Sequence, residues 1–217
     1  MQSIGLELHK LFNNHKRYYF PFSHHRKEIP NNGIYIIFER GEKFQDFDRI
    51  VRIGTHTGNN QLYSRLKEHF SKKNKNRSIF RKNIARCILN KERNPYLKIW
   101  DMDTTSGAEK KANSRWVDIE FEKQIEERIS KYIQENFSFC VFKVDCKKER
   151  LFWESKIAST LAQADYIVPS SAWLGKDSPK EKIKAFGLWQ VNGLEGEVIN
   201  EEELYKLTAL LDEKSDK

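Results

Sequence analysis

Two short apolar runs, each bounded by a glycine, restrict the fold of this chain more than any other feature of its sequence. The first run, residues 34–38, is Ile-Tyr-Ile-Ile-Phe and follows the turn signal Asn31-Asn32-Gly33. The second run, residues 49–53, is Arg-Ile-Val-Arg-Ile and ends at Gly54. β-Branched and aromatic residues favour strands, and the polar, glycine-containing segment between the runs has the character of a hairpin loop. The two runs therefore predict an antiparallel strand pair.

The segment that follows the second run predicts a loop and then a helix. Leu62, Leu66 and Phe70 are spaced four residues apart, which places them on one apolar stripe. Arg65 and His69 are also four residues apart and lie beside that stripe. We expect these two side chains to point together into a cleft at the edge of the helix.

Periodicity predicts further elements along the chain. Apolar residues between 121 and 133 have helical spacing, residues 138–145 have the pattern of a third strand, and residues 151–164 are again helical. Asn200 and Glu203 have the spacing of a reciprocal helix cap and predict a helix near the C-terminus.

These elements predict an α/β (α+β) fold with a small, mainly antiparallel sheet of three core strands flanked by helices. A length of 217 residues suits one such domain with elaborations better than two equal domains. We expect an N-terminal extension (1–30), a central domain (31–192) and a C-terminal helical region (193–217). The central domain contains an insertion near residues 86–120 that lacks sustained periodicity and is expected to be irregular.

The chain lacks the sequence marks of a membrane or secreted protein. No apolar stretch approaches the ~20 residues of a membrane span, and the N-terminal residues do not form a secretory signal. Cys87, Cys140 and Cys146 form no CxxC pair, which disfavours a disulfide framework and a Cys-rich zinc site. We therefore expect a cytoplasmic protein.

Positive charge is concentrated in one tract of the chain. The formal net charge is +8, yet residues 65–93 alone contain eleven Lys or Arg and only two Glu. Such a tract suits nucleic acid, because each phosphate contact releases condensed counterions. A solvated helix face without a partner is the alternative. The cations that we expect to contact nucleic acid are Lys72, Lys73, Lys75, Arg77, Arg81 and Lys82.

The order of the elements resembles that of the GIY-YIG nuclease superfamily. Gly33-Ile34-Tyr35 is similar to the first half of the family signature, and Arg52-Ile53-Gly54 is similar to the second half, with arginine in place of tyrosine. The helix with Arg65 and His69, the third strand and the helix with Glu154 then follow in the family's order. Phrases that resemble a little-characterised branch of this family occur at residues 51–56, 77–81, 169–175 and 187–193.

The resemblance implies a metal-dependent endonuclease that acts on DNA. Phosphodiester hydrolysis requires an activated water, neutralisation of charge on the phosphoryl oxygens and stabilisation of the departing alkoxide. By resemblance, Tyr35 contacts and helps to activate the water, Arg65 holds the scissile phosphate, and Glu154 binds one Mg²⁺ or Mn²⁺ ion. His69 is expected to hydrogen-bond the phosphate or Tyr35, and a tyrosine base requires positive charge nearby.

Two positions depart from the family pattern. Arg52 removes one hydroxyl from the site, although a cation there can orient the nucleophile or hold a phosphate. His56 is near enough in sequence to compensate, with a loop histidine as the alternative. Many relatives also have an asparagine after the metal-binding glutamate. The candidates for that role in this sequence are Ser170, Ser171 and Asn192.

Each candidate residue also has an ordinary structural explanation. Tyr35 is of a type often packed within a strand, and Glu154 can pair with Arg150 one turn earlier on a solvated helix face. Two rival functions remain for the whole chain: an inactive nucleic-acid-binding module of the same fold, and a protein whose basic tract meets an acidic partner. Cutting both strands with one active site per chain favours a homodimer.

Overall fold

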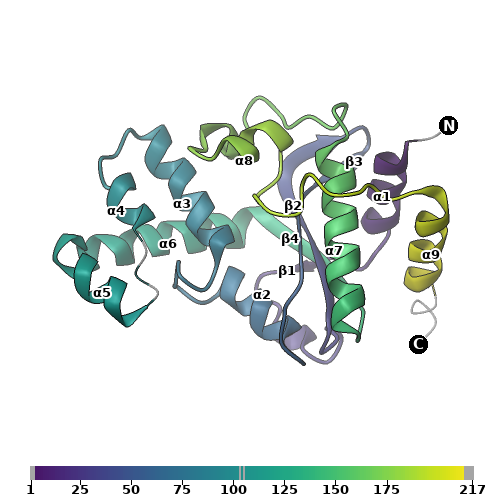
Figure 1. The fold of residues 1–217 in the computed structure, drawn as a ribbon, viewed down its shortest axis with the longest axis horizontal. Helices are drawn as coiled ribbons and strands as arrows, with labels where there is room; N and C mark the ends of the chain where they lie inside the picture. Colours follow the sequence, from purple (N-terminus) through teal and green to yellow (C-terminus); the bar gives the residue numbers. More distant parts are fainter. Residues whose placement is uncertain (1–2, 103, 105, 213–217) are drawn as a thin grey trace.

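The computed structural model describes residues 3–102, 104 and 106–212, and this part of the chain forms a four-stranded antiparallel sheet with helices on both faces (Figure 1). The strand order is β1-β4-β2-β3. The strands are β1 (Tyr18–Tyr19), β2 (Gly33–Phe44), β3 (Phe47–Gly54) and β4 (Phe137–Lys143). The α-helices are α1 (Ile4–Asn13), α2 (Leu62–Phe70), α3 (Ile79–Lys91), α4 (Leu97–Asp101), α5 (Gly107–Asn113), α6 (Ile119–Asn136), α7 (Lys147–Ala162), α8 (Glu181–Phe186) and α9 (Glu201–Asp212). Short 3-10 helices are η1 (Ser23–His25), η2 (Ser114–Trp116) and η3 (Leu174–Asp177).

The predicted α/β fold class is confirmed, and β2, β3 and β4 are the three expected core strands; β1 is a short addition at the edge of the sheet. The β2–β3 hairpin extends well beyond the two apolar runs, because polar residues of β2 are buried and partnered. The Glu39 carboxylate accepts hydrogen bonds from the indole N–H groups of Trp173 at 2.8 Å and Trp189 at 2.7 Å. The Glu42 carboxylate pairs with Arg49 at 2.7 Å. The expected loop is therefore reduced to the two residues between the strands.

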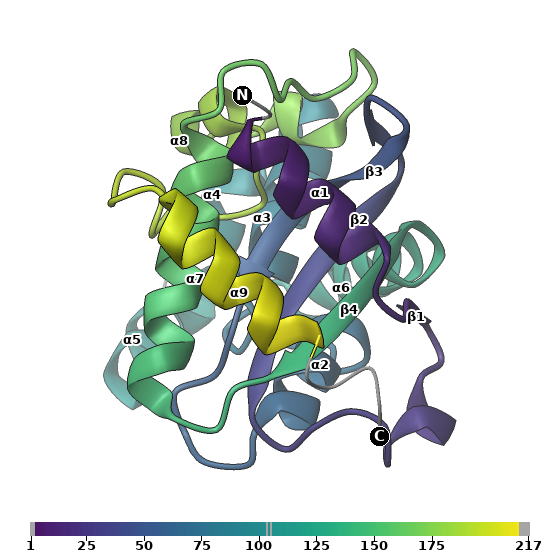
Figure 2. The same cartoon turned by 90° about the vertical axis from the view of Figure 1, so that its right-hand side faces the viewer.

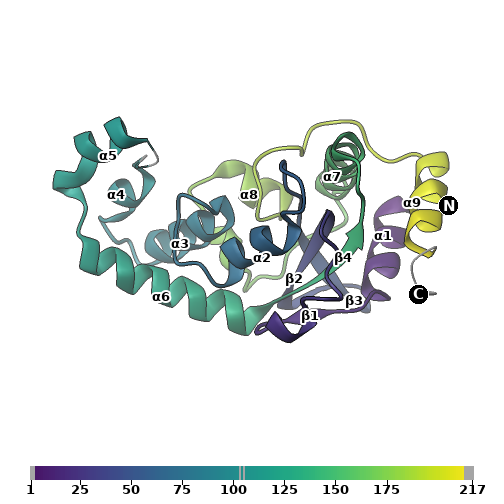
Figure 3. The same cartoon turned by 90° about the horizontal axis from the view of Figure 1, so that it is seen from below.

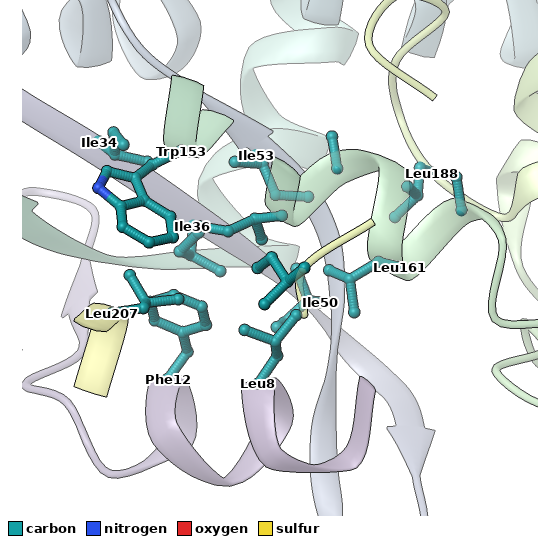
Figure 4. Packing of buried hydrophobic residues seen from close by; sticks show 14 of the residues in the cluster. Leu8, Phe12, Ile34, Ile36, Ile50, Ile53, Trp153, Leu161, Leu188 and Leu207 are labelled. Atoms are coloured by element: carbon teal, nitrogen blue, oxygen red, sulfur yellow. The ribbon is translucent and has the colours of Figure 1, made fainter. Parts of the chain in front are cut away.

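Alternate residues of β2 point to opposite faces of the sheet and enter separate cores. Ile34 and Ile36 pack with Leu8 of α1 and Trp153 of α7 (Figure 4). Tyr35 faces the other way, into a cluster that includes residues of α2, α3 and α6. The tyrosine of the candidate signature is thus on the face that carries α2.

The helices from the two ends of the chain share one core. In Figure 2, α1 and α9 lie near α7 on the same side of the sheet, and α1 contacts both other helices. The helix that the sequence predicts near the C-terminus is therefore present as α9, and the N-terminal extension contains α1. The division of the chain at residues 30 and 192 stays a prediction. Within the described ranges, no helix combines the length and apolar character needed to cross a bilayer.

The region near residues 86–120, which was expected to be irregular, contains the end of α3 and all of α4 and α5, so the expectation of irregular structure there is wrong. Figure 3 shows α4 and α5 extending away from the sheet beyond α3 and one end of α6. The apolar spacing did not reveal α3, because Arg81, Asn83 and Arg86 are buried on this helix alongside Phe80 and Ile84. A helix buried on most sides has no polar face, so it shows no clear amphipathic pattern.

His9 links α1 to the hairpin in a way that requires a neutral ring. Its Nδ1 lies 2.7 Å from the carbonyl oxygen of Gly5, and its Nε2 accepts the backbone N–H of Ile50 at 3.1 Å. Protonation of Nε2 would set two donors against each other. Burial is the main cause that lowers the pKa of His9 from 6.5 to about 4, and it outweighs the bond to Gly5.

Stability is therefore expected to fall on acidification. Between pH 6.5 and pH 4, His9 binds more protons in the unfolded chain than in the folded protein. The contribution of neutral His9 to the free energy of unfolding is therefore fully present above pH 6.5 and is lost as the pH falls. The loss from His9 alone is about 2 kcal/mol at pH 5. Urea unfolding at several pH values measures this loss. His9→Gln should be less stable than the unmodified protein at neutral pH but should lose less stability on acidification. Equal losses for the two proteins would contradict the assignment.

Candidate active site

The two glycines of the candidate signature lie where the chain leaves no room for a side chain. A Cβ atom at Gly33 would lie 2.2 Å from the carbonyl oxygen of Phe142, and one at Gly54 would lie 2.1 Å from the hydroxyl oxygen of Tyr35. Tyr35 and Gly54 are paired across the hairpin. The Thr55 hydroxyl donates to the Gly33 carbonyl at 2.7 Å and so joins the ends of the two strands. Gly54 thus leaves room for the Tyr35 hydroxyl, and Gly33 allows the backbone of β4 to approach.

A chain of hydrogen bonds connects Tyr35 to α2 and α3. The Tyr35 hydroxyl oxygen lies 2.8 Å from Nε2 of His69, and Nδ1 of His69 lies 2.7 Å from Oγ of Ser78. The same Ser78 oxygen accepts the backbone N–H of Arg81 at the start of α3. A neutral imidazole donates through one nitrogen and accepts through the other, so the chain occupies both nitrogens of His69. It fixes the orientation of the tyrosine and histidine rings.

His69 does not point into an open cleft, as the sequence led us to expect, because it is fully buried. Burial lowers the pKa of His69 well below its usual value, and the positive charges of Arg65, Arg52 and Arg81 lower it further. The ring is therefore neutral at physiological pH. Its contact with Tyr35 makes it a residue that orients the tyrosine hydroxyl.

Arg65 is a partly buried cation beside Tyr35. Its Nη1 donates to Oε2 of Glu68 at 2.9 Å and to the carbonyl oxygen of Arg77 at 2.7 Å. Burial lowers the pKa of Arg65, but the negative charge that Tyr35 can carry and the charge of Glu68 outweigh burial and raise it. The guanidinium is therefore permanently charged and held in one orientation.

Glu154 reaches the same end of the hairpin from α7. Its Oε1 accepts the backbone N–H of Thr55 at 3.1 Å. Burial raises the pKa of Glu154, although Arg52, the Thr55 N–H and Arg65 all oppose that rise. Arg150 donates instead to backbone carbonyl oxygens. The pairing of Glu154 with Arg150, which was the alternative explanation, does not occur.

The single carboxylate of Glu154 suits a cation that keeps most of its coordinating water molecules. Among the residues that the structure describes, no three His, Cys, Asp or Glu side chains gather into a metal-binding group. Glu154 offers one carboxylate, of which Oε1 is bonded to the backbone. Mg²⁺ keeps several waters and is commonly bound through one or two carboxylates together with substrate phosphates. Glu154 fits such an ion, whereas the described donors do not build a closed protein cage.

Arg52 is a fixed, buried cation at the place of the second signature tyrosine. Its Nη1 donates to the carbonyl oxygen of Trp189, and its guanidinium lies 5.4 Å from the centre of the Phe80 ring. Its Nε is buried and has no hydrogen-bond partner in the described part of the chain. The charge of Arg52 acts on both Glu154 and His69. Arg52 therefore contributes an electrostatic field to the site where the signature has a hydroxyl.

His56 holds the loop that follows β3. Its Nδ1 donates to the carbonyl oxygen of Gly58 at 2.9 Å, and its Nε2 accepts the backbone N–H of Gly33 at 3.4 Å. Burial lowers the pKa of His56, with Arg150 as a smaller cause, so the ring is neutral and both nitrogens are committed to the backbone. The loop and α2 enclose a pocket of about 350 Å³. Its lining residues are Thr55, His56, Thr57, Gln61, Ser64, Arg65, Glu68 and Arg77.

The basic tract divides into buried and exposed cations. Lys75 and Arg81 are buried, and they pair with Glu122 at 2.5 Å and Glu126 at 2.6 Å on α6. These two side chains hold helices together, so we remove them from the expected nucleic-acid interface. Of the six expected contact residues, Lys72, Lys73 and Arg77 are exposed and Lys82 is partly exposed.

The three candidates for the family asparagine lie in different places. Ser170 donates to Glu42 of β2 at 2.5 Å, and Ser171 is exposed. Asn192 is also exposed, and the carbonyl oxygen of the residue that follows it accepts the Ser159 hydroxyl of α7 at 3.0 Å. Asn192 is therefore the candidate whose segment is tied to the helix that carries the glutamate.

Sequence reasoning missed three residues that shape this site. Ser78 is of a residue type that favours a helix N-cap, but no sequence pattern indicated its hydrogen bond to His69. Glu68 had the three-residue spacing of a helical ion pair with Arg65. Gln190 accepts the backbone N–H of Ile53 at 2.9 Å and braces the outer edge of β3, and no local pattern predicts that contact.

The core of a GIY-YIG domain is defined by a tyrosine near the start of one strand, an arginine on the next helix and a glutamate on a later helix. This chain has these three residues in that arrangement, together with the two glycines that have no room for a side chain. The model of the GIY-YIG domain family matches residues 7–217, and the chain belongs to this family. At the level of the family, membership implies an endonuclease-type hydrolase. No curated protein and no solved structure matches the chain.

Proposed function

We propose that this protein is an endonuclease that hydrolyses DNA phosphodiester bonds with one Mg²⁺ or Mn²⁺ ion per active site. The observation that carries the proposal is the convergence of Tyr35, Arg65, His69 and Glu154 at one end of the β2–β3 hairpin. These residues come from one strand and two helices that are far apart in the sequence. Membership of the GIY-YIG family supports the same reaction class.

The residues have distinct roles in this proposal. Tyr35 holds the attacking water with its hydroxyl oxygen, and His69 orients that hydroxyl. Arg65 binds the scissile phosphate and stabilises the charge that develops on it, since a fixed donor aimed at developing charge is a large catalytic contribution. Glu154 holds the divalent cation, which when bound neutralises phosphoryl oxygens and stabilises the departing alkoxide. Arg52 supplies positive charge that keeps the Glu154 carboxylate closer to its ionised form.

The nucleic-acid interface in this proposal continues outward from the pocket. Arg77 lines the pocket, and the neighbouring exposed cations lie on the same connection between α2 and α3 or on the first turn of α3. His56 supports this surface by holding the loop that forms the facing wall. The proposed contact residues are Lys72, Lys73, Arg77 and Lys82.

Purified protein is expected to nick or cut DNA only when Mg²⁺ or Mn²⁺ is present. Supercoiled plasmid, single-stranded DNA, branched DNA and RNA, each with cation or with chelator, provide the measurement. Binding to a labelled duplex should weaken steeply as salt rises, because phosphate contacts release counterions. Binding without cleavage of any substrate would favour the inactive module, in which Arg52 replaces a necessary hydroxyl.

A further inference from the structure

Glu68 places a negative charge in the pocket that we assign to a phosphate. The pocket is lined by Arg65 and Arg77 as well as by Glu68. Like charges repel, so a carboxylate at this position opposes the entry of a polyanion. Glu68 therefore weakens phosphate binding in this pocket, and its contacts indicate what else it does there.

The Glu68–Arg65 contact is more enclosed than an ordinary ion pair on a helix surface. The Arg65 and Glu68 side chains are 25% and 17% exposed, and the contact is 2.9 Å long. The Lys123–Glu120 pair on α6 has the same three-residue spacing, but its side chains are 65% and 70% exposed. The enclosed pair is screened less by solvent and is held in one arrangement.

A single nitrogen of Arg65 donates hydrogen bonds to two acceptors, which hold the side chain in place. Nη1 donates to the Glu68 carboxylate and to the carbonyl oxygen of Arg77, which belongs to the connection between α2 and α3. A guanidinium binds carboxylates and phosphates through the same planar arrangement of N–H groups. The Glu68 carboxylate therefore makes the kind of contact with Arg65 that a phosphate makes.

We propose that Glu68 is a positioning residue that stands in for a substrate phosphate: its carboxylate holds Arg65 in the free protein, and an incoming nucleic-acid phosphate displaces it. This inference rests on the proposed function, because it assigns Arg65 to a phosphate. It separates two properties of Glu68. The negative charge weakens nucleic-acid binding, and the acceptor oxygen keeps Arg65 in one orientation in the free protein until the phosphate arrives.

Glu68→Gln removes the charge and keeps an acceptor oxygen, so it is expected to bind DNA about fivefold more tightly than the unmodified protein. The measurement is fluorescence anisotropy of a short fluorescein-labelled duplex, with chelator present so that no cleavage occurs. The gain should shrink as salt rises, because it is electrostatic. Glu202→Gln is the matched control: it makes the same change in net charge on α9, where Glu202 pairs with Lys206. The control should change the affinity less than twofold.

Glu68→Ala removes both the charge and the acceptor. It is expected to bind DNA less tightly than Glu68→Gln, because Arg65 then loses one of the two acceptors that hold it in the free protein before the phosphate arrives. The inference is overturned if Glu68→Gln binds no more tightly than Glu202→Gln, or if its gain is independent of salt. Failure of the proposed function is a separate result, because it appears as absent cleavage by the unmodified protein, whereas the binding comparison is decided in chelator whether or not DNA is cut.

Discussion

Glu154→Gln is expected to lower the rate of DNA cleavage by about 10³-fold at low Mg²⁺ while leaving DNA binding nearly unchanged. The amide keeps the size of the side chain and can still accept the Thr55 N–H, but it loses the charge that holds a divalent cation. The free energy of unfolding should stay equal or rise, because burial raises the pKa of Glu154 and so disfavours its ionised form. Plasmid cleavage and thermal unfolding measure the two effects.

The matched control for this substitution is Glu149→Gln. Glu149 is exposed in the first turn of the same helix, so its replacement changes the net charge equally and should leave cleavage at the normal rate. High Mn²⁺ is expected to restore part of the activity of Glu154→Gln, since a weakened site fills at higher concentration. Near-normal cleavage by Glu154→Gln at low metal would show that the cation binds elsewhere.

The core of the fold could be predicted because its signals are local. The glycine-bounded runs lie within β2 and β3, and the stripe of Leu62 and Leu66 places α2 on the sheet face that carries Tyr35. The meeting of Tyr35 with Arg65 and Glu154 has a different source. Resemblance to a family implied it, because no periodicity in the sequence brings residues of β2 and α7 to one point.

Buried polar residues account for most of what the sequence did not reveal. Glu39 accepts hydrogen bonds from Tyr132, Trp173 and Trp189, which are 93, 134 and 150 residues further along the chain. Arg81 likewise belongs to the basic tract by sequence, yet it is buried against a glutamate 45 residues away. A buried charge is acceptable only with partners, and partners at such separations leave no trace in a local pattern.

Arg65→Ala is expected to lower the rate of DNA cleavage for a different reason from Glu154→Gln. Removing a cation aimed at the phosphate should lower the rate on the order of 10²-fold at saturating DNA and metal. High Mn²⁺ should not restore the rate, because the carboxylate that holds the cation remains. Arg65→Lys should restore only part of it, since lysine keeps the charge but lacks the planar set of N–H donors that fits a phosphate.

The control for Arg65 is an arginine that is paired outside the pocket. Arg128 on α6 pairs with Glu92 and is 48% exposed, so Arg128→Ala removes the same charge from the surface and should leave cleavage unchanged. Single-turnover rates at saturating DNA separate the chemical step from binding. If Arg65→Ala cleaves as fast as Arg128→Ala under these conditions, Arg65 serves only to pack α2 against its neighbours. The phosphate would then have to be held by Arg77, the other arginine that lines the pocket.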